Sequence, residues 1–87
     1  MRASYDSTKN IVRLRWNYQQ PGDYYFIIYR SLKDEPLERY RTVEKTKMEY
    51  SDYALPDITK GYQYAIQAVY KNNEKITKMS RPTVIKR

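Results

Sequence analysis

The most constraining feature of this sequence is the stretch GYQYAIQAVY at residues 61–70. Apolar and aromatic side chains occupy alternate positions there: Tyr62, Tyr64, Ile66, Ala68 and Tyr70. A period of two is the period of a β-strand. Because the opposite parity carries two glutamines, we expect the tyrosine parity to face a core. The rest of the chain must then supply a second apolar layer.

The same pattern predicts six further short strands. They cover residues 2–6, 11–16, 24–30, 37–43, 48–55 and 76–84. Residues 24–30 (YYFIIYR) are apolar on both parities, which favours a central strand, whereas residues 37–43 alternate weakly, which favours an edge strand. No apolar period of 3.6 residues occurs, so helices are disfavoured. Strands at a spacing of roughly ten residues are typical of an all-β sandwich or barrel.

Composition limits both size and chemistry. The 87 residues make one small domain, and the chain contains neither His nor Cys. It therefore lacks the usual general base near neutral pH and the usual soft metal ligands. The acidic groupings, Asp34-Glu35 and Asp52 with Asp57, fall in predicted loops or turns and are interpreted as turn chemistry. We predict no enzyme, and no catalytic, cofactor-binding or metal-binding residues.

The net charge of +7 concentrates at the two ends. A basic terminus can bind a polyanion, but lysine along an outer strand also discourages edge-to-edge pairing of sheets. The interleaving of these lysines with strand residues favours edge protection and solubility. No apolar run is long enough for a membrane-spanning helix.

Three separated motifs resemble a fibronectin type III domain over essentially the whole chain. They are Leu14-Arg15-Trp16, then Phe26-Ile27-Ile28-Tyr29-Arg30, and then Tyr50-Ser51-Asp52 with Leu55 followed by the strand that begins at Tyr62. The last resembles the family's tyrosine corner, although Leu55 to Tyr62 is one residue longer than usual. The resemblance implies a seven-stranded immunoglobulin-like β-sandwich at residues 1–87, expected to be a piece of a larger protein.

The resemblance also implies a structural core. Trp16 would lie between the two sheets, and the Tyr62 hydroxyl would bond backbone near residues 56 to 59. The expected core residues are Leu14, Trp16, Phe26, Ile28, Leu55, Tyr62, Tyr64 and Ile66.

If Phe26 and Ile28 face the core, then Tyr25, Ile27 and Tyr29 lie on the outer face of the same sheet. Tyrosine is enriched in interface hot spots, so these three residues are the predicted interaction surface. The competing interpretation is that Tyr40, Arg41 and lysine stems cover them.

These observations lead to one functional hypothesis and its alternatives. The first is a non-catalytic spacer and protein-interaction module of a larger, extracellular or cell-surface bacterial protein, without a cofactor. Its partners would be neighbouring domains or another protein. The alternatives are carbohydrate binding by stacking on Tyr25 or Tyr29, and single-stranded nucleic-acid binding by a basic, tyrosine-rich surface. Nucleic acid is disfavoured because the basic residues concentrate at the ends of the chain.

Overall fold

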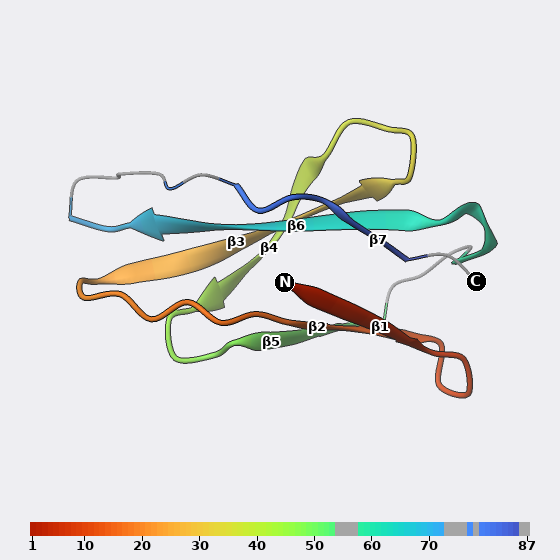
Figure 1. The fold of residues 1–87 in the computed structure, drawn as a ribbon, viewed down its shortest axis with the longest axis horizontal. Coiled ribbons are helices and arrows are strands. Elements are labelled where there is room, and N and C mark those ends of the chain that lie inside the picture. The colour runs from red at the N-terminus through yellow and green to blue at the C-terminus, as the bar shows by residue number, and fades with distance from the viewer. Residues whose placement is uncertain (54–57, 73–76, 78, 86–87) are drawn as a thin grey trace.

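The chain forms two antiparallel β-sheets that face each other (Figure 1). The computed structural model describes residues 1–53, 58–72, 77 and 79–85. One sheet has the order β1-β2-β5, with β1 at Arg2–Asp6, β2 at Ile11–Arg15 and β5 at Glu49–Asp52. The other has the order β4-β3-β6-β7, with β3 at Tyr24–Leu32, β4 at Glu38–Glu44, β6 at Tyr62–Tyr70 and β7 at Thr83–Ile85.

This arrangement confirms the predicted all-β, seven-stranded sandwich. The doubly apolar strand β3 lies between β4 and β6, and the weakly alternating β4 is an edge strand, as its sequence pattern indicates. Its exposed Arg39, Arg41 and Glu44 place charges along that edge, which discourages pairing with another chain.

Two local features flank β6. A short 3-10 turn, Ile58–Lys60, precedes it, and the missing 3.6-residue apolar period disfavours regular helices but not so short a turn. The last strand is also shorter than the predicted 76–84. The Ala68 N–H donates to the Thr77 hydroxyl at 3.2 Å and the Ile66 N–H to the Ser80 hydroxyl at 2.9 Å. Side-chain hydroxyls therefore replace part of the regular ladder before β7 begins after Pro82.

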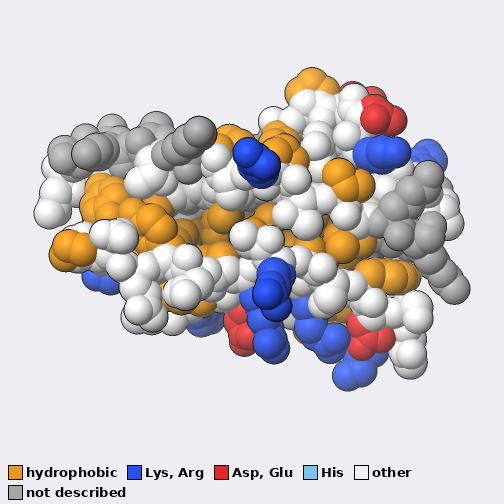
Figure 2. All heavy atoms as spheres, viewed as in Figure 1, with side chains coloured by type: hydrophobic (Ala, Val, Ile, Leu, Met, Phe, Trp, Pro, Cys, Tyr) orange, Lys and Arg blue, Asp and Glu red, His pale blue; other side chains and the backbone are white. Residues whose placement is uncertain are grey.

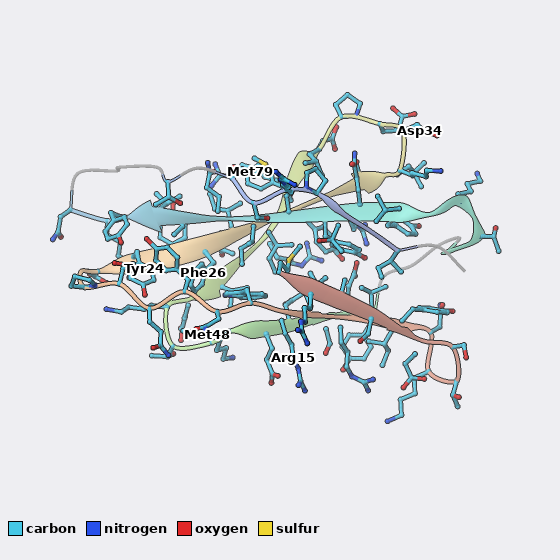
Figure 3. All side chains as sticks on the ribbon, viewed as in Figure 1. Arg15, Tyr24, Phe26, Asp34, Met48 and Met79 are labelled. Carbon is cyan, nitrogen blue, oxygen red and sulfur yellow. The ribbon has the colours of Figure 1, made fainter. Side chains whose placement is uncertain are left out.

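The core fills the space between the sheets. Phe26 and Tyr24 point from β3 into this space, whereas Arg15 points away from the sandwich (Figure 3). Trp16 contacts Phe26 edge-to-face, with ring centroids 5.5 Å apart. The expected core residues Leu14, Trp16, Phe26, Ile28, Tyr62, Tyr64 and Ile66 are all buried. Leu55 lies outside the described residues, and so do residues 56 and 57 of the backbone expected to receive the Tyr62 hydroxyl.

The turn before β3 depends on a glycine. Gly22 has a φ of +115°, and a Cβ atom there would lie 2.8 Å from the Tyr70 ring. Glycine therefore supplies both the backbone conformation and the space for Tyr70. Tyr70 in turn bonds the Tyr18 hydroxyl at 2.7 Å, which ties the β2–β3 connection to β6.

Charge and apolar surface separate on the face shown in Figure 2. Hydrophobic side chains form a band between the two layers, and many Lys and Arg side chains gather over the three-stranded sheet. Some of these cations are paired on that sheet, because Arg13 lies 3.2 Å from Asp6 and Arg15 lies 3.8 Å from Glu49.

Replacing Trp16 tests the core. We expect Trp16→Ala to lower the free energy of unfolding by about 3–5 kcal/mol, because it leaves a large cavity between the sheets. Trp16→Phe is the matched control. The Trp16 Nε1 atom is buried and has no hydrogen-bond partner among the described residues, so losing that N–H removes no hydrogen bond. Urea denaturation followed by circular dichroism measures the free energy of unfolding of both variants. Equal stability of Trp16→Ala and the parent chain would contradict the assignment of Trp16 to the core between the sheets.

Candidate functional site

The outer face of the four-stranded sheet carries the three residues predicted as an interaction surface. β3 places Tyr25, Ile27 and Tyr29 on this face, opposite Val69, Gln67 and Ala65 of β6. The expectation that Ile27 is exposed is wrong, because only 4% of it is accessible. Tyr25 and Tyr29 are partly buried. The predicted interaction surface therefore consists of two partly exposed tyrosines on either side of a buried isoleucine.

Neighbouring side chains explain this partial cover. The Tyr29 hydroxyl donates to Oε1 of Gln67 at 2.7 Å, although Tyr29 itself pairs with Ala65. That bond runs diagonally between the two strands, and Ala65, which pairs with Tyr29, is fully buried although it lies on an outer face. Gln67 is held from its other end as well, since its Nε2 donates to the Thr77 carbonyl at 2.9 Å.

A groove of about 510 Å³ runs along this face; we call it the outer groove. Ile27 and Val69, which is 6% exposed, lie in it together with both tyrosines. Arg39 pairs with Tyr29 across β3 and β4, and Lys71 bonds Asp23 one position before β3 begins. The groove therefore has a basic residue near each end, and the backbone positions of the two are about 20 Å apart along the strand at 3.3 Å per residue.

A second hollow of about 720 Å³ opens at the flank between the two sheets. Trp16, Tyr18, Phe26 and Tyr70 line it, together with Ser80. Its aromatic groups pack on one another, and the hydroxyls of Tyr18 and Tyr70 are bonded together. This hollow is an open margin of the core, and its lining also includes the polar residues Asn17, Gln20 and Thr77.

Sequence reasoning missed a buried polar cluster at Asp52. Asp52 ends β5 with 0% exposure, so its interpretation as a turn residue is wrong. Its Oδ2 accepts from Arg30 Nη1 at 2.8 Å and from the Tyr64 hydroxyl at 2.6 Å, and its Oδ1 accepts from the Tyr40 hydroxyl at 2.7 Å. Asp52 belongs to one sheet and these three partners to the other, so the cluster links the two sheets.

A pattern in the sequence could have revealed this cluster. Arg30 continues the inward parity of Tyr24, Phe26 and Ile28, and Asp52 pairs with the buried Val12 of β2. An inward Arg in one sheet and an inward Asp in the other require each other, because an unpaired buried charge is strongly unfavourable.

The cluster shifts the ionisation of its members. Burial, followed by the hydrogen bond to Asp52 and its negative charge, raises the pKa of Tyr40 to about 12 and raises the pKa of Tyr64 still further. Burial alone lowers the pKa of Arg30, but the hydrogen bond and charge of Asp52 outweigh it and raise that pKa overall. The Arg30 guanidinium also lies 3.9 Å from the Tyr40 ring centroid. The arrangement keeps both tyrosines neutral and both charges paired, which is a structural role.

Comparison with known proteins decides the family. The model of the PBP1-like, fibronectin3-like domain matches residues 1–80. The chain belongs to this family. Among curated proteins, no sequence matches this fibronectin3-like domain significantly.

A solved structure shares the fold. It is the crystal structure of pectate lyase PelI from Erwinia chrysanthemi in complex with tetragalacturonic acid, with a TM-score of 0.79 and 18% identity. The likeness covers 95% of the fibronectin3-like domain and 26% of the pectate lyase chain. At this identity it shows the sandwich fold alone.

The described part of the fibronectin3-like domain contains neither a candidate metal-binding cluster nor a candidate membrane-spanning helix. Residues 1–53, 58–72, 77 and 79–85 hold no group of three or more acidic, His or Cys side chains placed to bind a metal ion. In the same part, no helix has the length and apolar character needed to cross a membrane.

Removing one charge of the buried pair should destabilise the domain strongly. We expect Asp52→Ala to lower the free energy of unfolding by about 3–5 kcal/mol, because Arg30 loses its counter-charge and two tyrosine hydroxyls lose an acceptor. The matched control replaces both charges, Arg30→Met with Asp52→Leu, and should recover the part of that loss that comes from the uncompensated Arg30 charge, while the two hydroxyls still lack an acceptor. Chemical denaturation measures all three variants. A double variant no more stable than Asp52→Ala would show that charge pairing is not the cause.

The raised tyrosine pKa values predict sensitivity to alkali. Tyr40 has an ordinary pKa of 10.0 when unfolded and about 12 when folded. Its contribution to stability is therefore complete below pH 10 and is lost as pH rises through 12. We expect the free energy of unfolding to fall across this window, and to fall less steeply in Tyr40→Phe. Denaturation curves at several pH values test this, and identical slopes for both proteins would contradict it.

Proposed function

We propose that this fibronectin3-like domain is a non-catalytic module that presents the outer face of its four-stranded sheet to a binding partner. Its chemistry supports a binding role, since the chain has no His or Cys and the buried carboxylate of Asp52 is engaged by Arg30, Tyr40 and Tyr64. A carboxylate held in that way cannot approach a substrate without breaking the link between the sheets.

The observation that carries the proposal is the outer groove. A sandwich covers one face of each sheet, and the outer face normally carries polar side chains. Here that face holds Ile27, Ala65 and Val69, which are buried beside two partly exposed tyrosines. Rigid aromatic side chains over an apolar floor are typical of protein surfaces that bind other molecules.

We further propose that the domain serves as a spacer in a longer, exported or cell-surface bacterial protein. In PelI the matched region is 26% of the chain, so this fold occurs there as one part of a longer polypeptide. Absence of cysteine is compatible with export, because a buried ion pair and aromatic core can supply the links between sheets that disulfides supply elsewhere.

Nucleic-acid binding is less well supported by the geometry. Arg13 and Arg15 lie on the three-stranded sheet, where they pair with Asp6 and Glu49. The tyrosines of the outer groove lie on the other sheet. A single-strand platform needs its cations and its stacking rings along one path.

Footprinting tests the proposed interface. We expect hydroxyl-radical labelling of Tyr25 and Tyr29 to fall at least severalfold in the longer parent protein relative to the isolated domain, because a partner covers the groove. Tyr53, which is 70% exposed and lies outside the groove, is the internal control. Equal labelling of Tyr25 and Tyr29 in the two samples, with an unchanged Tyr53 signal, would rule out a neighbouring domain as the partner.

A further inference from the structure

The outer groove offers hydrogen-bond donors in excess of acceptors. Arg39 forms no ion pair within the described residues, and its guanidinium carries five N–H groups. The Tyr25 hydroxyl also has no hydrogen-bond partner in that part of the chain. Lys71 adds three donors, although it lies 3.7 Å from Asp23. The amide of Gln67 is already occupied at both ends.

The aromatic groups in the groove are suitably placed for a ring-shaped ligand. Tyr25 and Tyr29 are both partly exposed and line the groove, and the Tyr29 hydroxyl is held by its bond to Gln67. Tyr25 stands four residues along β3, about 13 Å away at 3.3 Å per residue. The apolar floor of Ile27 and Val69 lies between and beside them. Partly exposed tyrosine rings beside such a floor offer an apolar surface for the C–H groups of another ring.

We propose that the outer groove binds an acidic oligosaccharide, with sugar rings on Tyr25 and Tyr29 and a carboxylate on Arg39. This inference deepens the proposed binding role and rests on it. A uronate sugar combines an apolar ring face with a carboxylate and many acceptor oxygens, which complements a surplus of donors around tyrosine rings. Arginine is suited to this contact because its planar fork holds a carboxylate through two parallel hydrogen bonds.

Matched sugars provide the test. The full chain is titrated with β-1,4-linked mannuronate and α-1,4-linked galacturonate tetramers, and with the neutral mannose and galactose tetramers of the same linkages, while amide chemical shifts are followed. We expect at least one uronate to bind with a dissociation constant of roughly 1 mM or tighter, with shifts centred on β3 and β6. The neutral partner should bind about tenfold more weakly, and added salt should weaken the uronate complex.

Variants locate the site. Tyr29→Ala and Arg39→Gln should each weaken uronate binding about tenfold or more, because each removes one of the two main contacts. Arg15→Gln makes the same charge change on the three-stranded sheet and should leave binding unchanged. Thermal unfolding of each variant establishes that it is folded before titration.

Three results would overturn the inference. They are no binding of either uronate at about 5 mM, equal binding of neutral and acidic tetramers, or tighter binding of a single-stranded oligonucleotide or polyglutamate at the same groove. Each of these outcomes leaves the footprinting test of the binding face standing, since that test uses no sugar.

Discussion

The structure depends on the carboxylate of Asp52, which joins one sheet to three strands of the other. A fully buried charge is tolerated only when nearby groups compensate it, and here Arg30, Tyr40 and Tyr64 do so at 2.6–2.8 Å. The contacts require β5 to align with β3, β4 and β6 at once. A shift of one residue in any of these strands would turn its polar group to the opposite face, so the cluster also selects the register.

One irregularity in β4 links this core cluster to the outer groove. Pairing with β3 runs from Ile28 opposite Arg41 to Tyr29 opposite Arg39, which leaves Tyr40 as the extra residue of a β-bulge. The bulge lets Tyr40 reach inward to Asp52 and sets Arg39 beside Tyr29 on the outer face. With regular pairing, Arg39 would stand opposite Arg30 and bring like charges together. The bulge thus serves the stability of the core and the electrostatics of the proposed binding face.

The outer face shows how a strand that is apolar on both sides fits in a two-layer fold. Its inner parity enters the core, and on its outer parity Ile27 is buried between two partly exposed tyrosines. The hydroxyl bond from Tyr29 to Gln67 holds one of these tyrosines in place. The remaining exposed surface includes Tyr25, Tyr29 and Arg39, and this is the surface on which the proposed binding role rests.

The sequence by itself determined the strands, the inward parity of β3 and β6, the burial of Trp16 and the sandwich class, because these follow from a period of two and from local turn chemistry. It also placed Tyr25 and Tyr29 on the outer face. Only the tertiary structure decided that Ile27 is covered and that Asp52 is a core residue. Both depend on which side chains arrive from distant strands. The single-residue bulge in β4 that directs Tyr40 and Arg39 also could not be predicted, because it changes the pairing of β4 with β3 without altering the alternation of apolar residues in β3.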